Sequence, residues 1–260
     1  MPATDLERIN GFRMSFARRQ AAVVREVPGG IAVFDPEYPG SYEHNQLIIG
    51  RAAPAGLPAL ADKALGHLPY RRVSVLDDAA GAACAAAFAA GGYAHDVELV
   101  MTYAGEPPAP PAPAQLVSVP ELLPALIRQL CAWMPQASDG VIYQLAARRT
   151  ARLRGADDVR FLAARDENGV IASWADLYLD AGRPDPGRGI AQIEDVMTAD
   201  THLRRGYCGR VLATALHQAA GYGLVFLVAD AGDWPRTWYA RLGFTAIGRT
   251  HVFTRTQAVA

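Results

Sequence analysis

The sequence predicts two α/β units, each with helices packed on a mixed sheet, joined by a stiff linker. Segments with the period of a strand alternate with segments of helical period along most of the 260 residues. A run of prolines and alanines at residues 104–114 interrupts this alternation. The halves on either side of the run share a short pattern, which indicates an internal repeat. These observations favour the α/β (α+β) class, with domains at 1–103 and 115–260.

The composition is that of a folded chain with no strongly charged partner. Hydrophobic residues make up 51% of the chain, and the formal net charge is −1 at pH 7. This length fits one large domain or two of about 130 residues each. A nearly neutral chain gives no electrostatic reason to expect nucleic acid or an anionic membrane as a partner.

Cysteine and histidine usage indicates neither disulfides nor a metal. The cysteines Cys84, Cys131 and Cys208 form no metal-spaced pair, and their odd count argues against a disulfide framework. The six histidines are scattered, without an HExxH motif. Residues 1–10 lack the apolar core of a signal peptide, and no uncharged apolar run reaches membrane-spanning length. We therefore expect a cytoplasmic protein without a metal or a membrane partner.

In the first half, periodicity defines the expected elements and glycine pairs separate them. Gly29-Gly30 and Gly91-Gly92 each follow a segment of helical period. The expected helices cover 6–25, 57–68 and 79–90, and the expected strands cover 31–34, 45–49, 71–76 and 97–103.

Residues 104–114 are expected to form an extended linker, because proline lacks the N–H that a sheet or a helix needs. Beyond this linker, the expected strands cover 116–119, 158–164, 170–179, 189–197, 224–228 and 244–253. The expected helices cover 120–133, 141–154, 235–242 and a segment that begins in the loop at 203–209.

The junction between the strand at 189–197 and the helix after it carries the clearest chemistry. A short loop with Arg204, Arg205 and Gly206 runs directly into this helix. A helix start presents unpaired N–H groups and the positive end of the helix dipole, so a phosphate or pyrophosphate is the expected ligand. Gly206 allows a close approach, and the arginines add positive charge. The alternative is a glycine that only makes a turn.

Residues 190–255 resemble the GCN5-related N-acetyltransferase (GNAT) superfamily in two motifs. The acetyl-CoA loop of that family, Arg/Gln-x-x-Gly-x-Gly/Ala, aligns with Leu203-Arg204-Arg205-Gly206-Tyr207-Cys208. Here Leu203 stands at the Arg/Gln position and Cys208 at the small-residue position. The second motif, Trp238-Tyr239-Ala240-Arg241-Leu242-Gly243-Phe244, follows in the expected order.

The resemblance implies a GNAT-like domain with a mixed, mostly antiparallel sheet flanked by helices, and acetyl transfer from acetyl-CoA to a primary amine without a metal. It places the pyrophosphate on the loop and the pantetheine arm along the end of the preceding strand. The cofactor residues so implied are Val196, Met197, Thr198, Leu203, Arg204, Arg205, Gly206, Tyr207, Cys208 and Gly209.

The same resemblance makes Tyr239 the proton donor for the departing thiolate. A phenol can protonate a sulfur of similar pKa, and such proton transfer is worth about 10²–10⁴ in rate. Without the motif, a buried tyrosine on a helix would more often be part of the core.

A general base is expected on the strand before the loop. Some family members use a glutamate that aligns with Gln192, and Glu194 lies on the same predicted face. Glu194 is therefore a candidate base, acting directly or through a water; a structural carboxylate is the alternative. Strict alternation predicts one face made of Gln192, Glu194, Val196 and Thr198, and an opposite face made of Ile193, Asp195 and Met197.

The two halves of the chain show an internal correspondence. Phe88 aligns with Tyr239 at an offset of 151, and Gln46 aligns with Gln192 at an offset of 146. The five-residue difference falls between strand and helix, so the first half lacks the anion-binding loop. We therefore expect a tandem arrangement whose first copy has lost cofactor binding; the alternative is two unrelated α/β layers.

Two other functions are considered. One is an acyl-CoA sensor that binds without transferring the acetyl group. The other is a different nucleotide-binding α/β protein, which is disfavoured because neither GxxxxGK[ST] nor GxGxxG occurs. The amine acceptor, a small molecule or a protein, stays open, as does a homodimer.

Overall fold

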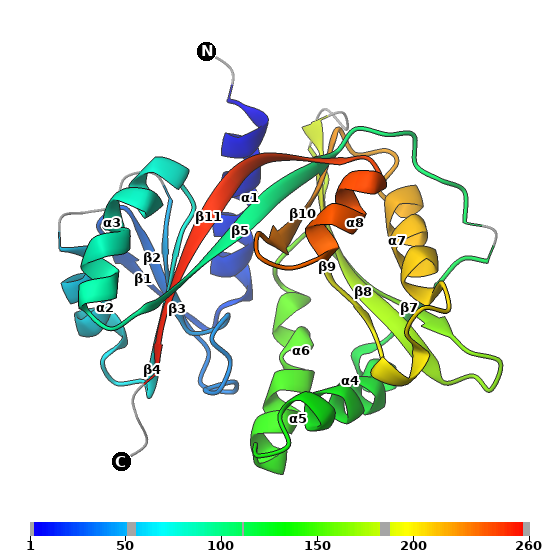
Figure 1. The fold of residues 1–260 in the computed structure, drawn as a ribbon, viewed down its shortest axis with the longest axis horizontal. Coiled ribbons are helices and arrows are strands. Elements are labelled where there is room, and N and C mark those ends of the chain that lie inside the picture. Colours follow the sequence, from blue (N-terminus) through cyan, green and yellow to red (C-terminus); the bar gives the residue numbers. More distant parts are fainter. Residues whose placement is uncertain (1–2, 51–55, 111, 183–187, 257–260) are drawn as a thin grey trace. The chain divides into compact units, whose positions relative to one another are not determined.

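The computed structural model describes residues 3–50, 56–110, 112–182 and 188–256 (Figure 1). The chain forms two compact units: Met1–Met101 with Val228–Ala260, and Thr102–Leu227. The first unit therefore combines two segments that are far apart in the sequence, and the second unit is continuous.

The first unit is a sheet with helices on both of its faces (Figure 1). Its strand order is β1-β2-β3-β4-β11-β5. The pairs β1–β2, β2–β3 and β4–β11 are antiparallel, and β3 runs parallel to β4. The elements are α1 (Asp5–Gln20), β1 (Val23–Val27), β2 (Gly30–Phe34), β3 (Gln46–Ile49), α2 (Leu57–Leu65), β4 (Tyr70–Val75), α3 (Asp78–Ala90), most of β5 (Ala94–Tyr103), α8 (Pro235–Arg241) and β11 (Phe244–Thr256).

Alternation along the strands divides the core of the first unit between the two faces. Leu47 and Ile49 of β3 pack with α2 and α3 on one face. Ile48, between them, packs with Ala17 of α1 on the other face. The strands of this sheet are thus buried on both sides.

The second unit is a four-stranded antiparallel sheet, β6-β7-β8-β9, extended by β10, which is parallel to β9. Trp174 and Phe161 pack with Leu122 and Leu126 of α4 on one face. Helix α7 packs on β7, β8 and β9. The elements are β6 (Gln115–Val117), α4 (Val119–Trp133), α5 (Asp139–Ala147), α6 (Arg149–Arg152), β7 (Asp158–Arg165), β8 (Ile171–Asp180), β9 (Ile190–Thr198), the 3₁₀ turn η2 (Asp200–His202), α7 (Tyr207–Gln218) and the start of β10 (Leu224–Asp230).

The predicted α/β class is confirmed, as is the mixed, mostly antiparallel sheet flanked by helices. The compact units nevertheless differ from the predicted domains 1–103 and 115–260, because residues 228–260 join the first hundred residues. The physical reason is β11, which pairs with β4 from His251↔Val75 to Thr256↔Tyr70. Periodicity predicts that this segment is a strand and carries no information about its partner.

Two element boundaries also differ from prediction. The helix expected at 6–25 ends at Gln20, and Val23–Val27 forms β1, a hairpin partner of β2 through Gly29 at φ 80°. The helix expected at 141–154 is divided into α5 and α6 at Arg148. The sequence expectations for residues 51–55, 111 and 183–187 lie outside the described residues.

Candidate active site

Strand β9, which the sequence analysis assigns to the cofactor, is irregular in the middle. In its pairing with β8, Glu194 lies opposite Asp176 and Met197 lies opposite Trp174. Two residues of β9 therefore lie opposite one residue of β8, which defines a β-bulge. Asp195, in the bulge, has a positive φ of 48°. A non-glycine residue in this region is uncommon and needs support from its surroundings.

The bulge shows that the strict alternation predicted for β9 is wrong beyond Glu194. Residues paired across antiparallel strands point to the same face, so Glu194 and Met197 share a face through their partners on β8. Thr198, opposite Ser173, points to the other face. The extra residue shifts the two-residue period by one position, and nothing in the apolar pattern marks the insertion.

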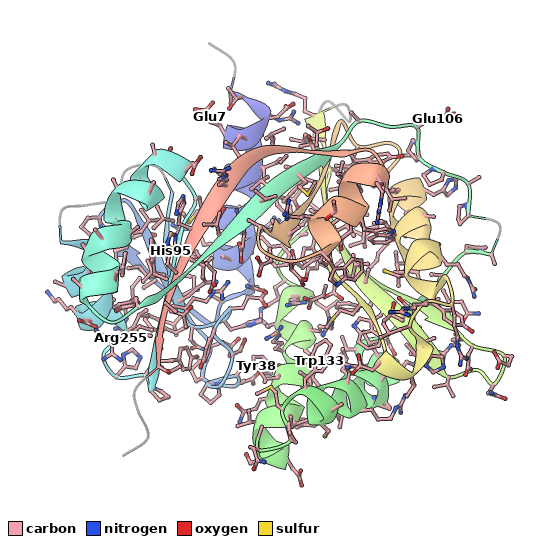
Figure 2. All side chains as sticks on the ribbon, viewed as in Figure 1. Glu7, Tyr38, His95, Glu106, Trp133 and Arg255 are labelled. Atoms are coloured by element: carbon pink, nitrogen blue, oxygen red, sulfur yellow. The ribbon has the colours of Figure 1, made fainter. Side chains whose placement is uncertain are left out.

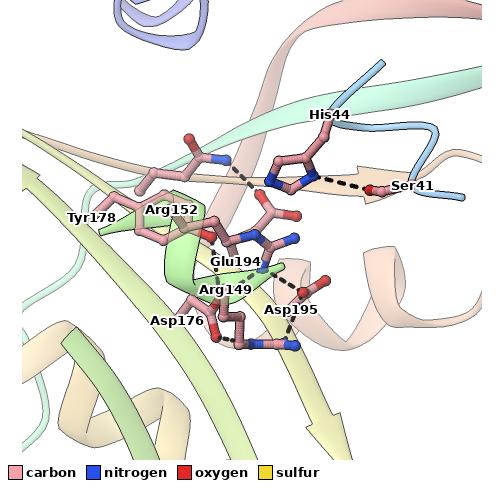
Figure 3. A network of polar contacts seen from close by, with 9 residues as sticks. Ser41, His44, Arg149, Arg152, Asp176, Tyr178, Glu194 and Asp195 are labelled. Atoms are coloured by element: carbon pink, nitrogen blue, oxygen red, sulfur yellow. Dashed lines mark hydrogen bonds and ion pairs between the residues drawn. The ribbon is translucent and has the colours of Figure 1, made fainter. Parts of the chain in front are cut away.

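Two arginines of the α5–α6 segment hold the bulge (Figure 3). Arg149 donates from Nε to Asp176 Oδ1 at 2.9 Å and from Nη2 to Asp195 Oδ2 at 2.8 Å. Arg152 donates from Nη1 to Asp176 Oδ2 at 2.6 Å and to Asp195 Oδ2 at 2.7 Å. The hydroxyl of Tyr178 donates to Asp176 Oδ2 at 3.1 Å. Asp195 thus points to the face of Asp176, whereas alternation predicts the face opposite Glu194.

The cluster is buried and strongly coupled. The side chains of Arg149, Arg152 and Asp176 are 3%, 1% and 0% exposed. Burial opposes the charge of Asp195, but Arg152 and Arg149 hold the pKa of this carboxyl well below its usual range. Burial likewise opposes the charge of Arg149, and Asp176 and Asp195 still raise its pKa. Asp195 and Arg149 therefore both carry charge at neutral pH and fix the position of the bulge.

The loop after β9 enters α7 through two residues with positive φ. Arg204 has φ 62° and Gly206 has φ 81°; Gly206 is the N-cap of α7. Among the described residues, no side chain caps this helix start. A Cβ placed on Gly206 would meet no atom within 4 Å. Arg204 and Arg205 are exposed, so the helix start is open and flanked by positive charge.

The end of β9 and the helix start are linked by side-chain hydrogen bonds. The Thr198 hydroxyl donates to Ser173 Oγ at 3.1 Å, and Ser173 donates to the carbonyl of Met197 at 2.5 Å. The Cys208 thiol also hydrogen-bonds to Thr198; burial nevertheless raises the pKa of this thiol. The structure therefore brings together two of the predicted cofactor segments, 196–198 and 203–209.

His202, which was not predicted from the sequence, lies just before the loop and contacts residues on both of its sides. His202 Nε2 lies 3.2 Å from Asp166 Oδ2 in the β7–β8 turn, and its Nδ1 lies 2.8 Å from Thr201 Oγ1. The ring also makes an edge contact with Tyr207 at a centroid distance of 5.8 Å. The guanidinium of Arg210 lies over the same Tyr207 ring, with its central carbon 5.8 Å from the ring centroid. His202 thereby connects the β7–β8 turn to Tyr207, the first residue of α7.

Glu194 and Tyr239, the two predicted catalytic residues, are described in separate units. Glu194 accepts a hydrogen bond from Gln192 Nε2 and is partly buried. Tyr239 lies on α8 of the first unit and is 7% exposed. Its ring contacts Trp238 and Phe244 at centroid distances of 5.2 and 5.7 Å. Each residue is thus held by residues close to it in the sequence.

Comparison with known proteins finds a family match over part of the chain. Residues 127–244 match the acetyltransferase (GNAT) family. The match spans α4 to the start of β11 and so includes both the loop and Tyr239. It supports a general acetyltransferase function. Among curated proteins, no sequence matches significantly.

Two solved structures are similar over most of the chain. One is a functionally unknown conserved protein from Staphylococcus epidermidis ATCC 12228, with 14% identity, coverage of 90% of this chain and 93% of that chain, and a TM-score of 0.66. The other is a GCN5-related N-acetyltransferase from Kribbella flavida, with 16% identity, coverage of 95% and 94%, and a TM-score of 0.60. At these identities the similarity shows the fold, which is GNAT-like.

Residues 3–50, 56–110, 112–182 and 188–256 contain neither a metal-ligand cluster nor a membrane-spanning helix. No group of three or more histidine, cysteine, aspartate or glutamate side chains in that part of the chain is arranged to hold a metal ion. No helix there has the length and apolar character to cross a membrane.

Proposed function

We propose that the protein is an N-acetyltransferase that transfers the acetyl group of acetyl-CoA to a primary amine. The observation that carries this proposal is the open start of α7. The N–H groups of Tyr207, Cys208 and Gly209 occupy the first turn, where the helix itself offers no acceptor. With the exposed Arg204 and Arg205 beside them, they suit the pyrophosphate of the coenzyme.

The backbone of Val196, Met197 and Thr198 is proposed to pair with the pantetheine arm as an added strand would. Supporting this, the described pairing of β9 with β10 covers only Ile190–Ile193. Beyond that point the bulge at Asp195 changes the course of β9.

In the proposed reaction the amine nitrogen attacks the thioester carbonyl carbon, and the carbon–sulfur bond breaks. The Tyr239 hydroxyl gives its proton to the departing thiolate. The nitrogen loses one proton to a base, for which Glu194 is the candidate, directly or through a water. The acceptor amine belongs to a small molecule or a protein.

Replacement of the tyrosine hydroxyl tests the chemical step. Tyr239→Phe is expected to lower kcat about 10²–10⁴-fold, since it removes a general acid. The affinity for acetyl-CoA, measured by isothermal titration calorimetry, should change little. Thiol release from acetyl-CoA across a panel of amines provides the rate, and Trp238→Phe, at the neighbouring helix position, is the control. Equal turnover of Tyr239→Phe and the unmodified protein would exclude the proton-donor role.

The same measurements separate the alternative function. A sensor would bind acetyl-CoA tightly and release no thiol with any amine in the panel. Binding that depends on Gly206 and Cys208, combined with absent transfer, would favour this alternative over the enzyme.

A further inference from the structure

The first unit contains a solvent-open cavity of 910 Å³, lined in part by exposed residues, that has no part in the proposed reaction. Gly50 and Leu76 line it, and they follow the parallel strands β3 and β4 directly. The start of α3 and one side of α1 complete its wall. Small molecules commonly bind at the carboxyl ends of parallel strands in α/β sheets. The volume lies within the range of such ligand sites, about 300–1,000 Å³.

A glycine in α1 keeps one wall of this cavity open. Gly11 lies in the middle of a helix of 16 residues, Asp5–Gln20, and lines the cavity. Glycine inside a helix costs about 0.5–1 kcal/mol relative to alanine. A Cβ at Gly11 would meet no atom within 4 Å, so crowding by the described residues does not account for the glycine. A longer side chain at position 11 would extend into the space that Gly11 lines.

The charges around the cavity are mainly negative. Glu7, Asp77 and Asp78 line it, against the single cation Arg249 among its described lining residues. Glu7 also accepts the N–H of Thr4 at 2.8 Å, and Asp78 Oδ1 lies 2.9 Å from His251 Nε2. Figure 2 shows Glu7 near the start of α1. The Asp77 carboxylate already accepts the N–H of Ala80 at 2.8 Å and caps α3. This helix start is therefore occupied by a carboxylate and is a poor site for an anion.

The rest of the lining described here is mostly apolar, and it gives a ligand a hydrophobic surface to contact. The apolar side chains are Leu6, Met14, Leu76, Ala79 and Ala82. We propose that the cavity of the first unit binds an organic ammonium ion with an apolar body. The carboxylates attract the ammonium group, and the apolar side chains cover the carbon skeleton.

Three probes of equal size and different charge test this proposal. They are 4-phenylbutylamine, 4-phenylbutanol and 4-phenylbutyrate, titrated by calorimetry into the full chain without acetyl-CoA. We expect the amine to bind at least tenfold more tightly than the alcohol, and the carboxylate to bind more weakly still. Equal affinities for the three probes would overturn the proposal. Because acetyl-CoA is absent, this result is independent of the proposed enzymatic function.

Variants then locate the amine. Gly11→Leu, which fills the cavity while favouring the helix, should reduce amine binding at least tenfold without lowering the Tm. Gly140→Leu, at an exposed position of α5, is the matched control and should leave binding unchanged. Unchanged binding in Gly11→Leu would place the amine elsewhere and refute the site.

Two charge variants should change amine binding in opposite directions. Asp77→Asn keeps an effective helix cap and should weaken amine binding severalfold, and Arg249→Gln should strengthen it. Glu37→Gln removes an exposed carboxylate outside the cavity and is the control. If both cavity variants behave like Glu37→Gln, electrostatic recognition of an ammonium group is excluded.

Discussion

Two strand-to-helix junctions, β9 to α7 and β3 to α2, are matched by the predicted internal repeat, and their helices begin in the same way. Gly206 and Gly56 are both N-caps in the left-handed conformation, with φ of 81° and 74°. Among the described residues, neither helix start has a side-chain cap. A Cβ would meet no atom within 4 Å at either glycine. Glycine geometry alone therefore does not distinguish an anion site from a turn.

The two helix starts differ in the residues that follow each glycine. In α2, Leu57 is 1% exposed, and Pro58 has no N–H to offer. In α7, Tyr207 and Cys208 are partly exposed and both keep their N–H groups. An anion site thus needs a complete and accessible set of donors as well as a permissive backbone.

The strands that lead into the two helices differ as well. Strand β3 pairs regularly with β2 over Gln46–Ile49 and with β4 over Leu47–Ile49. Strand β9 has the bulge that Arg149 and Arg152 hold through Asp195. A regular strand uses its hydrogen-bonding edges on its neighbours, whereas a bulged strand can turn away from one of them.

The largest expected effect comes from removing the charge that holds the bulge. Asp195→Asn should destabilise the protein by about 3 kcal/mol at pH 7, because the buried guanidinium groups of Arg149 and Arg152 then share the carboxylate of Asp176 in this cluster. The folded-state pKa of Asp195 is lowered, so its contribution is complete above the ordinary carboxyl pKa of about 4 and is lost as pH falls toward the folded value.

Urea unfolding between pH 3 and pH 7 measures this contribution. The stability difference between wild type and Asp195→Asn should shrink as pH falls below about 4. Asp139→Asn, in the first turn of α5, is the control, and its effect should stay within about 0.5 kcal/mol. A difference that does not vary with pH would contradict the ion-pair role of Asp195.

An intermediate effect is expected from giving α7 the proline of α2. Cys208→Pro copies the Gly-x-Pro order of Gly56-Leu57-Pro58 and removes one N–H from the helix start. A hydrogen bond to a charged group is worth about 1.5–3 kcal/mol, so acetyl-CoA affinity should fall about 10–100-fold. Calorimetry measures the affinity, and Cys208→Ala, which keeps the N–H, is the control. Equal affinities in the two variants would show that this donor is not used.

The smallest expected effect comes from alanine at the two glycines. Gly206→Ala and Gly56→Ala should each cost about 1 kcal/mol of stability, because both residues have positive φ. Only Gly206→Ala should also weaken acetyl-CoA binding. Thermal unfolding with and without acetyl-CoA compares the pair; an equal loss of ligand-induced stabilisation in both would break the contrast between α7 and α2.

The sequence predicts most helices and strands because their periodicity is local. The apolar positions of α7 and the alternation of β4 each identify an element without reference to the rest of the chain. The partner of β11 could not be predicted, since apolar alternation is compatible with pairing at either edge of several strands.

In the candidate site, too, local features were predictable from the sequence and long-range contacts were not. The loop at 203–209 is predictable because glycine and arginine act locally at a helix start. The Arg149–Asp195 contact joins residues that are far apart in the sequence, and only one weak feature of the sequence indicates it. That feature is Asp176, a buried carboxylate in the middle of the mostly apolar strand β8.

The pairing of β11 with β4 also determines the order in which the two units can fold during translation. Thr102–Leu227 is continuous and can complete its contacts while later residues are still being added. The sheet of the first unit must wait for Phe244–Thr256, which leaves the edge of β4 uncovered in the meantime. Such distant pairing slows folding, and an open edge invites association with other chains. Before β11 has been synthesised, the uncovered edge of β4 is thus available for pairing with other strands.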